Sequence, residues 1–157
     1  MKDIKVIVAA HKQYQMPTDE MYLPLQVGAE GKEKIDNFAQ DNKEKNISKL
    51  NPYFCELTGL YWAWKNLNVD YIGLVHYRRY FTLDKKIYGT ENEKFKNVLT
   101  LKAADKILDR ADIILPKKRK YYIENLYSHY KHTMYVEPLD ETRRIIEEKF
   151  PEYLQEF

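Results

Sequence analysis

The sequence contains one cysteine, Cys55, so no disulfide can form within the 157-residue chain. A chain without disulfides is typical of a reducing compartment. Because Cys55 lies in an apolar stretch with no base beside it, we expect a core residue rather than a nucleophile. The amino terminus lacks a signal-peptide core, and no apolar run reaches about 18 residues. We therefore expect a cytoplasmic protein that can act at the inner face of the plasma membrane.

Excess charge of either sign is also lacking, because 26 Lys and Arg residues face 24 Asp and Glu residues and leave a formal net charge of +2. Such a chain has no global field that attracts nucleic acid, so any basic site must be local. Tyrosine, in contrast, is abundant, with 14 residues. Its flat apolar face and polar tip suit sugar or base binding as well as ordinary packing. The length and composition predict one globular domain, 1–157.

Several familiar catalytic motifs are absent from the sequence. There is no glycine-rich phosphate loop, no cysteine pair for zinc, no H-E-x-x-H and no G-x-S-x-G. Adjacent acidic residues occur at 19–20, 140–141 and 147–148, where a helix or loop surface explains them. The chemistry must therefore be carried by other segments.

Three short apolar stretches predict buried parallel strands, at 4–10, 70–76 and 111–115. Helical spacing of apolar residues predicts one helix that begins at Asn51 and ends at Asn66 or Asn68, and another near 99–108 with Thr100 as its cap. The polar segment 32–49 predicts a surface loop, 121–130 a helix, and 141–149 a last helix capped by Asp140. Strands alternating with helices predict an α/β fold with a mostly parallel sheet.

Five consecutive residues with polar tips follow the second predicted strand: His76, Tyr77, Arg78, Arg79 and Tyr80. Ligands of open α/β sheets bind at the carboxyl ends of the strands. Arginine binds phosphate through a planar, permanently charged fork, and histidine donates or accepts protons near neutral pH. The alternative is one structural arginine with tyrosines that only pack. We expect the cluster as a whole to bind a phosphate-bearing ligand.

Two further segments carry polar groups of interest. The basic run 117–120 follows the third predicted strand, and it is explained by an anion site or by a solvated surface. His129 and His132 are three residues apart, so on a helix they share a face. No third metal ligand lies near them in the sequence, and a sugar or acceptor contact is the better interpretation.

The stretch 51–66, Asn-Pro-Tyr-Phe-Cys-Glu-Leu-Thr-Gly-Leu-Tyr-Trp-Ala-Trp-Lys-Asn, followed by 70–81, Asp-Tyr-Ile-Gly-Leu-Val-His-Tyr-Arg-Arg-Tyr-Phe, resembles a family of bacterial capsular and exopolysaccharide biosynthesis proteins regarded as glycosyltransferases. The resemblance extends over essentially the whole chain. It implies a GT-A-like fold, which is a Rossmann-like α/β sheet that binds a nucleotide-diphosphate sugar. It also implies that the chain covers the N-terminal, donor-binding portion of a longer family domain.

The resemblance also implies positions for the site. The loop after the first strand, here Ala10, His11 and Lys12, is expected to meet the nucleotide, together with the cluster 76–79. GT-A enzymes usually carry an acidic D-x-D pair that binds Mn²⁺ or Mg²⁺ at the end of a later strand. The corresponding place here, 75–78, has no acid. Either side-chain cations replace the metal, or the acidic pair lies elsewhere. Additional donor or acceptor contacts are expected at Asn46, Ser48, Lys117, His129 and His132.

These expectations lead to a primary hypothesis about function. The chain transfers a sugar from a nucleotide-diphosphate donor to a capsular, exo- or lipopolysaccharide acceptor, with His76 as the candidate catalytic residue and the base otherwise unassigned. The alternative is a non-catalytic module that binds a nucleotide sugar or a glycan. Nucleic-acid binding through 117–120 is disfavoured by the nearly balanced charge.

Overall fold

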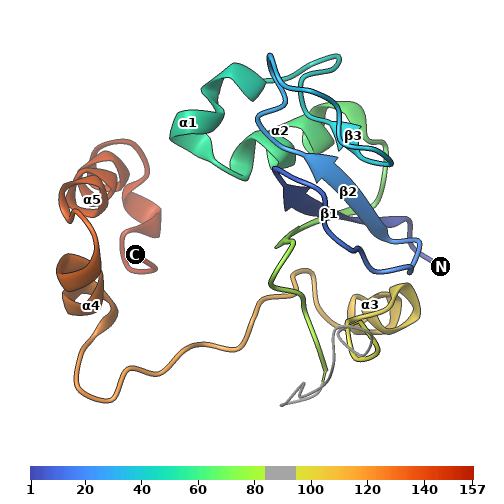
Figure 1. The fold of residues 1–157 in the computed structure, drawn as a ribbon. Coiled ribbons are helices and arrows are strands. Elements are labelled where there is room, and N and C mark those ends of the chain that lie inside the picture. The colour runs from blue at the N-terminus through green and yellow to red at the C-terminus, as the bar shows by residue number, and fades with distance from the viewer. Residues whose placement is uncertain (84–94) are drawn as a thin grey trace. The chain divides into compact units, whose positions relative to one another are not determined.

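Residues 1–116 are built on a parallel β-sheet (Figure 1). The computed structural model describes residues 1–83 and 95–157. The strands are β1 (Ile4–Ala10), β2 (Tyr22–Gln26), β3 (Ala39–Gln40) and β4 (Tyr71–His76), in the order β3-β2-β1-β4. Every neighbouring pair is parallel, so the carboxyl ends of all four strands lie at one edge. The predicted fold class is confirmed.

The core lies on both faces of β1, because alternate residues of a strand point to opposite sides. Ile7 and Ala9 pack with Trp62 on α2 (Leu57–Asn66), whereas Val6 and Val8 pack with Ala104 on α3 (Leu101–Ile107). A strand covered on both faces must be apolar throughout, and β1 is nearly so. The two helices therefore cover opposite faces and leave the strand ends open at the edge of the sheet.

Strand β2 was not predicted, and Pro24 lies at its centre although proline is rare inside sheets. The structure shows why proline is tolerated at this position. Strand β3 pairs with Leu25 and Gln26, so on that side no described residue pairs with Pro24. β2 is thus a central strand at its carboxyl end and an edge strand at its start.

The predicted surface loop 32–49 contains a buried carboxylate. Asp41 is 0% exposed, and each of its two carboxylate oxygens accepts two hydrogen bonds. The backbone N–H groups of Gly28 and Ala29 donate from 2.8 and 3.0 Å. The hydroxyls of Ser48 and Thr58 donate from 2.6 and 2.7 Å. A buried charge requires such pairing, so Asp41 ties the end of β2 to the start of α2. The surface-loop prediction is wrong at Asp41 and Ser48.

The single helix predicted from Asn51 is two helices, α1 (Asn51–Phe54) and α2, preceded by a 3₁₀ turn at Ser48–Leu50. Cys55 separates them with a φ of +47°. The side chain of Asn51 donates to the Cys55 carbonyl at 2.7 Å, which stabilises the break instead of capping a helix start. Cys55 is exposed, so the prediction of a core cysteine is wrong. The backbone reversal at this residue, which apolar periodicity does not reveal, accounts for the difference.

Gly28 is predicted to be irreplaceable at the junction with Asn51. Its φ is +60°, and an added Cβ would lie 2.3 Å from Asn51 Oδ1. Because Asn51 also holds the Cys55 carbonyl, it cannot move away freely. We expect Gly28→Ala to lower the free energy of unfolding by roughly 2–4 kcal/mol in urea denaturation. Gly31→Ala is the control, since Gly31 has a φ of +69° but nothing within 4 Å. Equal losses in the two variants would contradict the steric argument.

Helix α3 begins as predicted at Thr100, whose hydroxyl accepts a hydrogen bond from the Ala103 N–H at 3.4 Å. The Asp19 carboxylate accepts a second one from the Leu101 N–H at 3.1 Å. These bonds satisfy backbone donors that a helix start leaves without partners. Residues 84–94, which belong to the polar segment before α3, lie outside the described residues.

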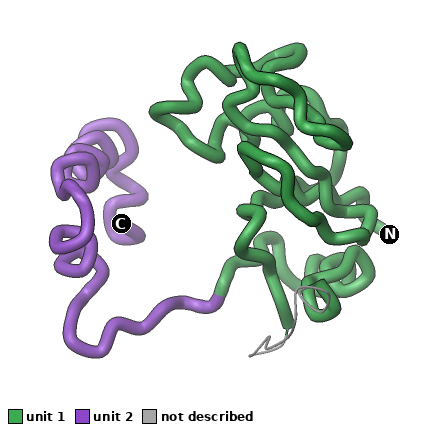
Figure 2. Tube along the Cα trace, viewed as in Figure 1, with its two compact units in different colours: residues 1–116 green, residues 117–157 purple. Residues whose placement is uncertain are grey.

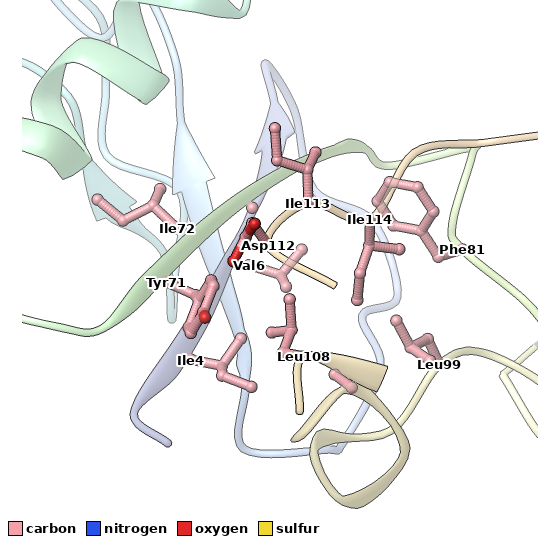
Figure 3. A pocket seen from close by; sticks show the side chains of 12 residues that line it. Ile4, Val6, Tyr71, Ile72, Phe81, Leu99, Leu108, Asp112, Ile113 and Ile114 are labelled. Carbon is pink, nitrogen blue, oxygen red and sulfur yellow. The ribbon is translucent and has the colours of Figure 1, made fainter. Parts of the chain in front are cut away.

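The third predicted strand, 111–115, is wrong, because within the described part of the chain these residues form no strand. Ile113 and Leu115 are 71% and 75% exposed. Ile113 and Ile114 line an apolar hollow of about 180 Å³ together with Ile4, Val6 and Leu108. Figure 3 shows these side chains around the hollow. Among the described residues, however, the segment has no hydrogen-bonded neighbouring strand, which a strand requires.

Residues Lys117–Phe157 form a second compact unit (Figure 2). It contains α4 (Leu126–Thr133), α5 (Glu137–Lys149) and a 3₁₀ turn at Pro151–Tyr153. Helix α5 begins before the predicted cap Asp140, since Pro138 suits a first turn. Whether both units form the single predicted domain stays a prediction. Among the described residues, no helix combines the length and apolar character that crossing a bilayer requires.

Candidate functional site

Two of the predicted segments meet at the carboxyl edge of the sheet. Strands β1 and β4 are neighbours, and Ala9 lies in register with His76. The residues that follow each strand are therefore adjacent, and the ring centroids of His11 and Tyr77 are 5.5 Å apart. The structure thus brings together the loop after β1 and the cluster 76–79, as the parallel-sheet prediction required.

A tight turn presents the two arginines. The Arg79 N–H donates to the His76 carbonyl at 2.8 Å, and the two residues form a short antiparallel bridge. The central residues of this turn are Tyr77, which is buried, and Arg78, and the last residue is Arg79. Arg78 and Arg79 are both exposed. Among the residues that the structure describes, neither guanidinium has a carboxylate within ion-pair distance, so both are available to an anion.

An open hollow of about 480 Å³ lies beside this turn. Six residues line it: Glu56, Leu74, Val75, His76, Arg78 and Arg79. Leu74 and Val75 belong to β4, and Glu56 immediately precedes α2. The hollow therefore combines an apolar strand end, two guanidinium groups, an imidazole and one carboxylate. Sequence reasoning found its cations but missed Glu56, because the carboxylate is twenty residues away in the chain and becomes adjacent only through the α2–β4 connection.

His76 is held in one orientation inside the hollow. Its Nδ1 accepts a hydrogen bond from the Arg78 backbone N–H at 3.3 Å, and its Nε2 lies 3.8 Å from a Glu56 carboxylate oxygen. Burial lowers the pKa of His76, and the charges of Arg78, Arg79 and His11 lower it further, while Glu56 acts in the opposite direction. His76 is therefore neutral at pH 7, and a proton on Nε2 is the tautomer that this geometry requires.

An aromatic pair supports the other side of the turn. Tyr77 is buried, and its ring stacks on Tyr14 with centroids 3.8 Å apart and an interplanar angle of 15°. The Arg78 guanidinium lies 5.1 Å from the Tyr77 ring, and Lys12 Nζ lies 5.5 Å from the Tyr14 ring. Hydrogen bonding between the hydroxyls lowers the pKa of Tyr14 and raises that of Tyr77. Tyr14 was not predicted; its place directly after β1 was the available signal.

Three predicted contact residues have structural roles. The methyl group of Ala10 is 1% exposed, and its carbonyl accepts a hydrogen bond from the Val27 N–H. Ser48 is buried and donates to Asp41, and a ligand contact at Ser48 stays a prediction. Asn46 accepts from the Ser48 N–H at 3.1 Å and donates to the Glu44 carbonyl at 2.9 Å, which shapes the same loop. His11 and Lys12, by contrast, are exposed at the edge of the sheet.

The remaining predicted residues belong to the second unit. His129 and His132 share one face of α4, and both contact the Glu124 carboxylate. A hydrogen bond from His132, and to a smaller extent one from His129, lowers the pKa of Glu124. Tyr121 stacks on His129 with centroids 4.3 Å apart. Lys117 precedes this region and is exposed. Ligand contacts by Lys117, His129 and His132 stay predictions.

The described residues contain no group of three or more histidine, cysteine or acidic side chains placed to hold a metal ion. The end of β4 is the place expected for a D-x-D pair, and the residues there are His76, Tyr77 and Arg78. Glu56 is the only carboxylate among the residues that line the described hollow at this edge. The positive groups of the hollow are therefore its main means of compensating an anionic ligand.

Comparison with known proteins supplies three findings. A solved structure of WbbM, a bifunctional glycosyltransferase in its apo form, matches the chain with a TM-score of 0.80 and 29% sequence identity. The match covers 96% of this chain and 30% of that one, so the chain spans under a third of that protein's length. None of the curated proteins compared with the chain matches it. A family model described as a domain of unknown function, DUF4422, matches residues 5–157, and the chain therefore belongs to this family.

Proposed function

We propose that this protein is a glycosyltransferase that transfers a sugar from a nucleotide-diphosphate donor to a growing capsular, exo- or lipopolysaccharide acceptor. The observation that carries the proposal is the pair of exposed arginines, Arg78 and Arg79, beside a hollow at the carboxyl edge of a parallel sheet. The likeness to a glycosyltransferase structure supports it. The acceptor is a glycan or a lipid-linked glycan, and the protein works on the cytoplasmic side, at the inner face of the membrane.

The geometry suits the departure of a nucleoside diphosphate. Negative charge develops on the diphosphate as the bond to the sugar breaks, and fixed cations stabilise that charge. Arg78 and Arg79 supply two such cations, and the exposed Lys12 supplies a third at the neighbouring strand end. Arginine forks bind phosphate oxygens in pairs, which fixes the diphosphate as well as neutralising it. In this proposal these side chains perform the role that a metal ion held by a D-x-D pair performs elsewhere.

The stacked pair of Tyr14 and Tyr77 gives the edge a rigid aromatic wall. Its exposed part belongs to Tyr14, since Tyr77 is buried. Aromatic faces pack against nucleobases and against the apolar faces of sugars. We assign the nucleoside to this side, next to His11 and Lys12, and the sugar to the side of His76.

A thermal-shift screen tests this function. The 157-residue chain is heated with UDP-, GDP- and dTDP-linked sugars, each with and without Mn²⁺ or Mg²⁺. A ligand at about 100 times its Kd stabilises the native state by about 2.7 kcal/mol, which raises the unfolding temperature by roughly 5–10 °C for a chain of this size. We expect one nucleotide class to do so without added metal. Release of the nucleotide in the presence of an acceptor then separates an enzyme from a binding module. No shift with any nucleotide sugar would contradict the proposal.

A further inference from the structure

Glu56 has a side chain that the fold does not use. The residue precedes α2, and its backbone carbonyl accepts from the Gly59 and Leu60 N–H groups. Its side chain makes no capping hydrogen bond to the helix. Within the described part of the chain, the only basic side chain within 4 Å of its carboxylate is that of the neutral His76, whose Nε2 lies at 3.8 Å. The carboxylate therefore lines the hollow without contributing to the structure around it, which distinguishes it from the buried Asp41.

Charges of opposite sign face the same hollow without neutralising one another. Glu56, Arg78 and Arg79 all line it, yet within the described residues no ion pair joins the carboxylate to either guanidinium. A diphosphate placed next to Glu56 would be repelled, and placed next to the arginines it would be attracted. A ligand that fills the hollow must therefore have an anionic part at the arginine end and a neutral, hydrogen-bonding part at the glutamate end.

His76 adjoins both groups, because its Nε2 lies 3.8 Å from Glu56 and its Nδ1 accepts from the Arg78 backbone N–H. Its neutral ring carries its proton on Nε2, the nitrogen that faces the carboxylate, because Nδ1 accepts the Arg78 N–H. The glutamate end thus offers one N–H donor and one charged acceptor within 3.8 Å of each other. A hydroxyl group both donates and accepts a hydrogen bond, so it satisfies this pair of groups simultaneously.

We infer that Glu56, with His76, binds the hydroxyl groups of the donor sugar, while Arg78 and Arg79 hold the diphosphate. The inference rests on the proposed function and assigns a sugar-recognition residue to its site. Hydroxyl donors bind a carboxylate more strongly than a neutral acceptor. Affinity for the sugar part therefore depends on the charge of Glu56, whereas affinity for the diphosphate part does not require it.

The test compares ligands that differ only in the sugar: UDP-glucose with UDP, GDP-mannose with GDP, and dTDP-glucose with dTDP. Calorimetric titration gives the ratio of affinities within each pair for the wild type and for Glu56→Gln. For the pair that binds the wild type, we expect the nucleotide sugar to bind Glu56→Gln at least about 10-fold more weakly. The free nucleoside diphosphate should bind that variant equally well or more tightly, because a repulsive charge is removed.

Glu44→Gln is the matched control, since it removes the same charge from an exposed residue that does not line the hollow. It should leave both affinities unchanged, and both variants should unfold at the wild-type temperature. If Glu56→Gln weakens both ligands equally, or neither, the inference is wrong although the proposed function stands. If no pair binds the wild type, the proposed function fails, and this inference fails with it.

Discussion

Replacing Arg78 and Arg79 together with alanine is expected to lower the affinity for the donor nucleotide by at least about 100-fold, because each charge-assisted contact to phosphate contributes roughly a factor of ten or more. Turnover should fall at least as far, since the same cations stabilise the departing diphosphate. Both side chains are exposed and, among the described residues, have no carboxylate partner. The double variant should therefore keep the wild-type unfolding temperature.

Lys102→Ala with Lys106→Ala is the control for charge. These lysines are exposed on α3 and do not line the hollow, so the variant loses the same two charges elsewhere in the first unit. Its affinity for the nucleotide should stay within about twofold of the wild type, since surface charges beyond about 10 Å are largely screened at physiological salt. Wild-type affinity in the double arginine variant would eliminate the proposed role of the turn.

Replacing Asp41 with alanine is expected to lower the free energy of unfolding by about 3–5 kcal/mol, since removing the partner of buried polar groups leaves them without hydrogen bonds. Two backbone N–H groups and two hydroxyls lose their acceptor at once. A typical domain is stable by only about 5–15 kcal/mol, so much of the population should unfold at 37 °C. Urea denaturation followed by circular dichroism measures the loss.

Two further substitutions separate charge from packing at Asp41. Asp41→Asn keeps the shape but turns an amide N–H₂ toward a backbone N–H donor, so we expect an intermediate loss of roughly 2 kcal/mol. Asp36→Asn, at an exposed residue of the same loop, should change the stability by less than about 0.5 kcal/mol. A loss below about 1 kcal/mol for Asp41→Ala would show that the network does not hold the loop.

The sheet was predictable where a strand is covered on both faces. Apolar, β-branched residues in β1 and β4 indicated parallel strands, and the structure adds that the two strands are neighbours, so the residues that follow them are adjacent. The same apolar signal gave a wrong strand at 111–115, because in a sequence apolar residues that line a hollow cannot be distinguished from those of a buried strand. The signal did not indicate β2, which contains Pro24. Proline is permitted there because β3 is short and does not reach it, and the length of a neighbouring strand cannot be read from the segment itself.

The site was predictable in its cations and not in its other groups. Arg78 and Arg79 are conspicuous in the sequence because they follow a strand. Glu56 looks like a helix-surface residue, and only the fold places it beside the end of β4. Asp41 lies in a polar segment, and its burial depends on donors from three separate parts of the chain. Tyr14 required the register of β1 and β4 before its contact with Tyr77 could be seen. Long-range pairing decides each of these positions.

The central claim is that a nucleotide sugar binds at the carboxyl edge formed by β1 and β4. The most direct test is an NMR titration of the ¹⁵N-labelled 18.9 kDa chain with the nucleotide sugar that raises its unfolding temperature most. We predict that the largest chemical-shift changes fall at residues 11–14 and 76–79, including the arginine side chains, and that α3 stays unchanged. Changes confined to 117–120 or to the helices of the second unit would contradict the claim.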